Sequence, residues 1–203
     1  MRNSQELELK TIYLFRHGMT ELNKKHAYCG STDVPLCQEG IDSLIELKKK
    51  YTFPDISDCR ILTSGMKRTL QTLEILYPDQ KSRADISENF REIDFGDFEG
   101  FTYEELKERQ DYQKWITGNN EANICPNGES GEQMKKRVME AFCSIQKNEY
   151  SYALFTHGGV IACIMEHLFP FEHKNRWEWQ CGFGEGYALS FKAGNWFYKT
   201  IPY

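Results

Sequence analysis

Residues 11–18 of the chain are TIYLFRHG, a short apolar run that stops at an arginine, a histidine and a glycine. A β-prone apolar run followed by a polar turn is typical of a buried strand that ends in a loop. Two further segments repeat the pattern: CRILT (59–63) ends at Ser64, and YALFT (152–156) ends at His157-Gly158-Gly159. The sequence therefore predicts three buried strands, each ending in a polar turn.

Segments with apolar residues at helical spacing separate these strands. One covers 40–51, and another follows Ser64, which we expect to cap it, and ends at Pro78. A third opens at Ser130, which with Gln133 three residues later forms a capping-box pattern.

A fourth apolar segment, 160–168, follows the third strand, and the last two β-prone runs, 187–191 and 196–201, flank a turn and predict paired strands. Strands that alternate with helices form a mostly parallel sheet covered on both faces. We therefore expect a single domain over residues 1–203, an α/β fold with three α/β/α layers.

The composition narrows the function classes. Lys plus Arg number 25 against 30 Asp plus Glu, a net charge of −5, which argues against a nucleic-acid binder. The most apolar stretch, 160–165, is too short to cross a bilayer, and the start MRNSQELELK has no apolar signal region. Seven scattered cysteines without a C-x-x-C pair indicate reduced thiols. We expect a cytoplasmic protein without nucleic-acid or membrane partners.

The polar residues that follow the strands point to phosphate chemistry. In a parallel sheet the carboxyl ends of the strands meet at one edge, where ligands bind, so Arg16, His17, Arg68 and His157 should converge there. Two guanidinium groups match the oxygens of a phosphoryl group. Their charge would lower the pKa of a histidine between them and favour the neutral imidazole that can attack phosphorus.

Six motifs in a fixed order extend this hypothesis. They are LFRHGMTELN (14–23), CGSTDVPL (29–36), SGMKRTLQT (64–72), REIDFGDFEG (91–100), PNGES (126–130) and THGG (156–159). The series resembles that of the histidine phosphatase superfamily, in its phosphoglycerate-mutase-like branch. The resemblance implies the phosphoglycerate-mutase-like α/β/α fold and a phosphomonoesterase that needs no metal or other cofactor.

The resemblance also implies a role for each matching residue. His17 would be the nucleophile that becomes a phosphohistidine. Arg16 and Arg68 would bind the phosphoryl oxygens, and His157 would donate a further hydrogen bond to them. Glu92 would protonate the leaving alkoxide and then accept a proton from the attacking water.

Three more matching positions are expected near the substrate phosphate. Asn23 would touch it, although this residue could equally cap a turn, Gly30 would lie in a loop beside it, and Gly158 would contribute backbone. The assignment of Glu92 leaves alternatives open, because other carboxylates crowd the same segment: Glu88, Asp94, Asp97 and Glu99.

Three functions remain open within this resemblance. Mutases of the family usually carry a longer insertion after the Glu92 motif, whereas 25 residues separate Gly100 from Pro126, so hydrolysis is favoured over a cofactor-dependent phosphoglycerate mutase. A silent phospho-ligand binding module would not need a nucleophile with an acid. The middle segment and GYALSF (186–191) are similar to alpha-ribazole and broad-specificity phosphatases. The expected partner is a small phosphorylated metabolite, with alpha-ribazole 5'-phosphate one candidate, and a homodimer is left open.

An aromatic-rich segment covers residues 169–187 and contains six Phe, Trp and Tyr residues. Packing against the core is the simpler expectation. The alternative is that Trp177 or Trp179 lines the mouth of the pocket and favours a flat or apolar leaving group.

Overall fold

The computed structural model describes residues 10–119 and 121–203. The first nine residues of the N-terminal stretch MRNSQELELK lie outside the described residues. The described strands form one sheet in the order β3-β2-β4-β1-β5-β6. Their bounds are Thr11–Arg16 (β1), Arg60–Thr63 (β2), Ala84–Ile86 (β3), Tyr152–Thr156 (β4), Gly186–Lys192 (β5) and Asn195–Ile201 (β6). Strands β1 to β4 pair in parallel, and β5 and β6 are antiparallel to their neighbours. The prediction of a mostly parallel sheet is confirmed.

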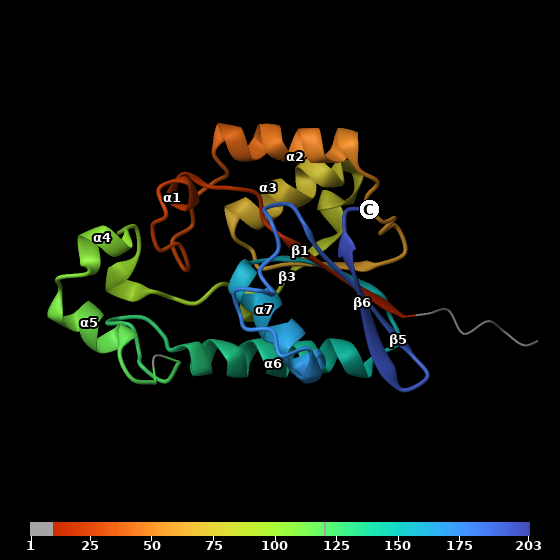
Figure 1. Cartoon of the computed structure of the whole chain (residues 1–203). Coiled ribbons are helices and arrows are strands. Elements are labelled where there is room, and N and C mark those ends of the chain that lie inside the picture. Colours follow the sequence, from red (N-terminus) through yellow and green to blue (C-terminus); the bar gives the residue numbers. More distant parts are fainter. Residues whose placement is uncertain (1–9, 120) are drawn as a thin grey trace, which may run out of the picture.

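Helices cover both faces of this sheet. The α-helices are Glu21–Lys24 (α1), Gln38–Lys50 (α2), Lys67–Leu76 (α3), Tyr103–Leu106 (α4), Gln110–Ile116 (α5), Gly131–Lys147 (α6) and Gly158–Leu168 (α7). Short 3-10 helices cover Pro78–Arg83, Glu88–Phe90, Gly96–Phe98 and Pro170–Glu172. Helices α2 and α3 lie on one face and α6 and α7 on the other, while α4 and α5 extend beyond one end of the sheet (Figure 1). The predicted α/β/α layers are therefore present.

Strand β1 shows why both faces must be covered. Successive side chains of a strand point to opposite faces. Ile12 and Leu14 accordingly pack in the core cluster with α6 and α7, and Phe15 packs with Leu44 of α2 and Leu73 of α3. All five side chains have no exposed surface. Because this central strand is apolar on both sides, helices must cover both faces of the sheet.

The expected helix start at Ser130 and the expected C-terminal hairpin are both present. The Ser130 hydroxyl accepts from the Gln133 amide at 3.1 Å, and the Gln133 side chain accepts from the Ser130 amide at 2.8 Å. Strands β5 and β6 are joined by Ala193 and Gly194, both with positive φ (50° and 81°), which is the geometry of a tight hairpin turn.

The expectation that Ser64 caps the following helix is wrong. Helix α3 starts at Lys67 after Met66, which gives no side-chain cap. Gly65, at φ 82°, continues the turn beyond Ser64, and the Lys67 amide donates instead to the Asp33 carboxylate at 2.7 Å. A residue distant in the sequence thus supplies the cap, and this leaves the Ser64 hydroxyl available for another contact.

Strand β3 was not expected from the sequence. It has three residues, Ala84–Ile86, of which Asp85 and Ile86 are exposed, and it pairs with β2 alone at the edge of the sheet. A short edge strand with a central aspartate has no apolar run to reveal it.

The seven cysteines are free thiols, as predicted. Within residues 10–119 and 121–203, every helix is too short or too polar to cross a membrane.

The two tryptophans of the aromatic segment have opposite environments. Trp179 is fully buried against Phe169, Tyr187 and Tyr198, whereas Trp177 keeps 76% of its surface exposed. Packing is therefore the correct expectation for Trp179 and not for Trp177.

Candidate active site

The ends of β1, β2 and β4 meet as the sequence predicts. These strands are adjacent and parallel, with Arg16 of β1 opposite Thr156 of β4. The His17 amide donates to the Thr156 carbonyl at 3.0 Å, and the rings of His17 and His157 lie 5.1 Å apart at 63°. Two histidines are therefore in edge-to-face contact at the carboxyl edge of the sheet.

His17 is buried in one defined tautomer. Its Nδ1 lies 2.6 Å from the Gly18 carbonyl oxygen, which can only accept, so Nδ1 carries the proton and Nε2 bears the lone pair. Burial lowers the pKa of His17 well below its usual value, and the charges of Arg68 and then Arg16 lower it further. The direction agrees with the prediction from the sequence, although burial is the larger cause. Nε2 is thus a nitrogen nucleophile that does not need to lose a proton first.

Arg68 is a fully buried cation. Its three nitrogens donate to the carbonyls of Thr32 (2.9 Å) and Gly30 (2.6 Å) and to Nδ1 of His157 (3.3 Å). A guanidinium has five N–H groups, so these three hydrogen bonds leave two N–H groups without an acceptor among the described residues. All three partners are neutral, and none of the ion pairs between described residues includes Arg68.

Arg16 is the second cation of the site. Nη1 donates to the Cys181 carbonyl at 2.6 Å, and the guanidinium carbon lies 4.2 Å over the Phe183 ring. Its Nε is buried and has no partner among the described residues. A Cβ on Gly158 would come within 3.3 Å of this guanidinium, so the glycine allows the start of α7 to pack against it.

His157 uses both ring nitrogens inside the protein. Nδ1 accepts from Arg68, which can only donate, so the ring is neutral and Nε2 carries the proton towards the Ser64 hydroxyl, 2.8 Å away. Burial, followed by the charges of Arg68 and His17, lowers the pKa of His157 well below its usual value. In this arrangement His157 orients Arg68.

Glu92 is held by two backbone amides. Its Oε1 accepts from Ile93 at 3.0 Å and its Oε2 from Gly159 at 2.9 Å. A Cβ on Gly159 would lie 2.3 Å from Oε1, so a glycine is needed for this approach. Glu92 also lies close enough to Arg16 to interact with its charge.

The other acids of this segment have different partners. Glu88 pairs with Arg91 at the surface, Asp94 accepts from Ser31, and Asp97 accepts from Asn127. Within the described residues, Glu92 is the member of this acidic group that lines the same cleft as Arg16.

Glu99 holds the loop whose carbonyls bind Arg68. Its carboxylate accepts from the backbone amides of Gly30, Ser31, Thr32 and Phe95, at 2.9 to 3.3 Å. With their amides fixed by Glu99, Gly30 and Thr32 present their carbonyls to Arg68. The sequence alone suggests Glu99 only as an alternative acid, because nothing in one sequence shows that a carboxylate is surrounded by amides.

Arg137 on α6 holds the segment that carries Glu92. It donates to the carbonyls of Asn89, Arg91 and Glu92 at 2.8 to 2.9 Å and pairs with Glu129. Nothing in the sequence singles out Arg137, since an arginine in an amphipathic helix is usually a surface residue.

The remaining predicted site residues lie nearby in different roles. Asn23 lines the cleft, and its Oδ1 accepts from Thr20 in the capping box of α1, which leaves the amide nitrogen as the group able to donate to a ligand. Gly30 donates its amide to Glu99 and its carbonyl accepts from Arg68, so it acts through Arg68. A Cβ there would meet the Ile93 carbonyl at 1.7 Å.

A cleft of about 890 Å³ opens at Arg16 and Glu92. It extends past Asn23 and Tyr28 to Trp115 of α5, and Trp177 also lines it. Trp177 is therefore the tryptophan of the aromatic segment that reaches the cleft.

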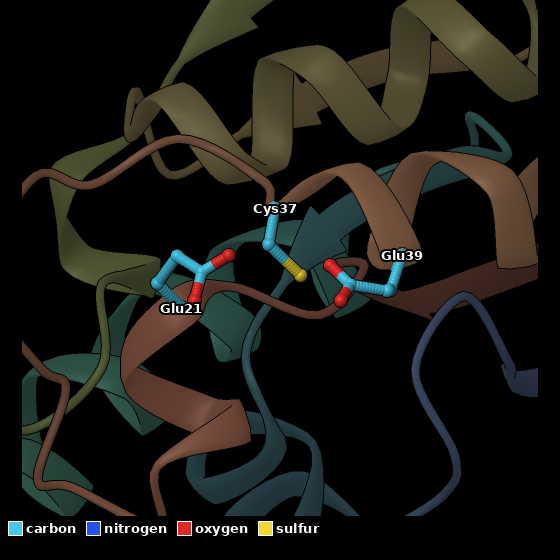
Figure 2. Close-up of side chains that lie close together, drawn as sticks. All are labelled: Glu21, Cys37 and Glu39. Carbon is cyan, nitrogen blue, oxygen red and sulfur yellow. The ribbon is translucent and has the colours of Figure 1, made fainter.

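One group of possible metal ligands occurs in the described part of the chain. Glu21, Cys37 and Glu39 place their ligand atoms within 4.8 Å of one another, where α1 meets the start of α2 (Figure 2). The Cys37 sulfur accepts from the Gly40 amide at 3.4 Å as the cap of α2, and Glu39 pairs with Lys24. Helix capping and an ion pair account for this cluster, and we assign no metal to it.

Comparison with known proteins agrees with this geometry. The model of the histidine phosphatase superfamily (branch 1) matches residues 12–202. The chain belongs to this superfamily. Among curated relatives, human 6-phosphofructo-2-kinase/fructose-2,6-bisphosphatase 4 is 29% identical over 161 residues, which are 78% of this chain and 33% of that protein. The chain thus spans about a third of the length of the curated relatives it matches.

Solved structures of the superfamily share the fold. The alpha-ribazole phosphatase from Shigella flexneri superposes with a TM-score of 0.78 at 22% identity, over 95% of this chain and 96% of that one. The phosphoglycerate mutase from Bacillus anthracis superposes with a TM-score of 0.70 at 19% identity, over 97% and 95%. At these identities the superpositions establish the architecture alone.

The lowered pKa of His17 gives a first test. In phosphate-free buffer, NMR should show His17 neutral at pH 6.5, protonated on Nδ1, with exposed His26 as the reference signal. Because the folded pKa lies below the ordinary value near 6.5, the unfolded chain binds more protons between the two. This histidine therefore makes the protein less stable as the pH falls through that window. Titration of His17 at or above pH 6.5 would contradict the assignment.

The contacts of Glu99 with the backbone amides of residues 30–32 give a second test. Glu99→Ala removes the carboxylate that accepts hydrogen bonds from the backbone amides of residues 30–32. The loop then no longer holds its carbonyls in position to bind Arg68. We expect kcat/KM for a phosphate monoester to fall about 10- to 100-fold, as for other displacements of a binding group. Glu99→Gln, which keeps one acceptor oxygen, should recover part of the loss. Glu88→Gln in the same segment is the control, and equal losses in Glu88→Gln and Glu99→Ala would refute the positioning role.

Proposed function

We propose that the chain is a metal-independent phosphomonoester hydrolase that acts through a phosphohistidine on His17, with a small phosphorylated metabolite as substrate. The observation that carries the proposal is the pair of cations, Arg16 and Arg68, beside a neutral histidine: within the described residues, neither arginine forms an ion pair with a carboxylate. Buried charges are normally paired. A phosphoryl dianion supplies the missing counter-charge, so the site needs no metal ion to bind it.

Formation of the phosphoenzyme depends on the tautomer of His17. The Nε2 lone pair forms the N–P bond while the bond from phosphorus to the ester oxygen breaks. Arg16 and Arg68 donate to the non-bridging oxygens, where charge is greatest. Glu92 acts as the general acid and gives its proton to the leaving alkoxide. The hydrogen bond that we expect His157 to donate to a phosphoryl oxygen would compete with the contact between His157 Nε2 and the Ser64 hydroxyl.

Hydrolysis of the intermediate reverses the role of Glu92. Its carboxylate accepts a proton from water as the water oxygen attacks phosphorus and the N–P bond breaks. Inorganic phosphate leaves, His17 returns to the neutral form, and Glu92 is again protonated. The amides of Ile93 and Gly159 hold the carboxylate in one orientation through both steps.

The rival functions differ in the fate of the phosphoryl group. A phosphoglycerate mutase would return it from the enzyme to a reoriented substrate, and a binding module would not become phosphorylated. Alpha-ribazole 5'-phosphate is a candidate substrate, since alpha-ribazole phosphatases have this fold. Fructose 2,6-bisphosphate is an alternative suggested by the names of the curated relatives.

A panel of phosphate monoesters tests the proposal. The panel includes these two compounds and is run with EDTA, beside a mutase assay. We expect phosphate release that EDTA does not change. Isomerisation of phosphoglycerate without phosphate release would favour the mutase, and a lack of turnover across the panel would refute the hydrolase.

The role of Glu92 can be tested through the leaving group. Glu92→Gln keeps the shape and removes the acid. Phosphorylation by an alkyl phosphate should slow about 10²- to 10⁴-fold, the usual contribution of a general acid. p-Nitrophenyl phosphate, whose leaving group needs little protonation, should be affected far less in a single-turnover burst. Equal slowing of both substrates would exclude Glu92 as the acid, and Asp97→Asn serves as the control.

A further inference from the structure

The cleft is much larger than a phosphoryl group. At about 890 Å³ it falls within the range of roughly 300–1,000 Å³ that holds whole ligands, and the residues expected at the phosphoryl group that line it are Arg16, Asn23 and Glu92. Beyond Glu92 its walls are largely aromatic and aliphatic. They include Tyr28, Phe95, Trp115, Ile116 and Trp177. The space next to the scissile bond is therefore available to the leaving group and is mainly apolar.

Trp115 is the fixed aromatic surface of this space. Trp115 lies in α5, and its ring packs edge-to-face on Tyr28 (5.6 Å, 82°) and Phe95 (6.1 Å, 88°). These two contacts hold the ring in place. Its Nε1 is buried without a partner among the described residues. Because Nε1 has no accessible surface, the part of Trp115 that lines the cleft is the apolar ring.

Trp177 is the second aromatic residue and comes from a segment distant in the sequence. It is 76% exposed, an unusual amount for the largest apolar side chain, and it lines the cleft. The adjacent Arg176 is bonded to Glu121 at 2.8 Å, which fastens the segment with Trp177 to the one that follows α5. This ion pair brings an exposed aromatic ring and the Trp115 side of the cleft into one site.

The charges around this space disfavour a second anionic group. Besides Arg16, the lysine and arginine side chains that line it are Lys24 and Arg176, and each is already paired, with Glu39 and Glu121. His26 also lines the cleft but is exposed. A second phosphate or a carboxylate on the leaving group would have to break one of these ion pairs, whereas an uncharged ring would not.

We propose that the cleft beyond Glu92 is a leaving-group subsite for an uncharged, ring-bearing alcohol, and that Trp115 and Trp177 determine this specificity. The inference rests on the proposed phosphomonoesterase activity and names its substrate class. It selects aromatic or heteroaromatic monoesters over sugar bisphosphates.

Two probes compare leaving groups with and without a ring: 1-naphthyl phosphate and glycerol 2-phosphate. Trp177→Ala should lower the ratio of kcat/KM for the naphthyl ester over the glycerol ester about 2- to 10-fold, the usual size of an aromatic contact. Phe171→Ala is the matched control, because Phe171 is 88% exposed in the same segment and lies outside the cleft lining.

Trp115→Ala removes the second aromatic wall of the cleft. It should lower the ratio of kcat/KM for the naphthyl ester over the glycerol ester about 2- to 10-fold, the usual size of an aromatic contact. An unchanged ratio would remove Trp115 from the proposal.

A binding measurement keeps the subsite testable apart from turnover. Calorimetry with His17→Ala should show tighter binding of 1-naphthyl phosphate than of glycerol 2-phosphate or fructose 1,6-bisphosphate. Tighter binding of the bisphosphate, or unchanged ratios in Trp177→Ala, overturns the subsite even if the enzyme hydrolyses every ester. Absence of hydrolysis with the binding preference intact overturns the proposed activity and leaves the subsite standing.

Discussion

The Arg68 guanidinium is buried without a carboxylate partner among the residues that the structure describes, and the site depends on this constraint. A cation removed from water is costly unless it is paired, and here its partners are two backbone carbonyls and a neutral imidazole. The same charge helps to keep His17 neutral, so one unfavourable burial prepares both the anion site and the nucleophile. Arg16, whose Nε has no hydrogen-bond partner in the described part of the chain, adds a second cation to the site.

The acidic residues of the chain explain how this site stays positively charged in a protein of net charge −5. Carboxylates near the site are occupied by backbone amides or by other arginines. Glu99 binds the amides of the 30–32 loop, and Glu129 pairs with Arg137, which in turn holds the segment of Glu92. The acids fix the backbone around the two cations without neutralising them, and a net charge says little about the field in one pocket.

The sequence predicts the elements whose signal is local. The apolar runs that end at His17 and His157, the Ser130 capping box and the β5–β6 hairpin are each set by neighbouring residues, and parallel pairing then brings the strand ends together. Contacts between distant segments were not predictable. Asp33 caps α3, so Ser64 is left to bind His157, and a single sequence does not show that Glu99 faces amides or that Trp177 is exposed. The order of six motifs indicated the family where the spacing of any one could not.

The most direct test of the account is the site of phosphorylation within the imidazole ring. The Gly18 carbonyl holds the Nδ1 proton of His17, so phosphoryl transfer must occur at Nε2. The protein is quenched in base during turnover of a phosphate monoester, and the peptide that contains His17 is examined by mass spectrometry and phosphorus NMR. The account predicts an acid-labile, base-stable Nε2-phosphohistidine that is lost in His17→Ala. Phosphate on Nδ1, on another residue, or on none during active turnover would contradict it.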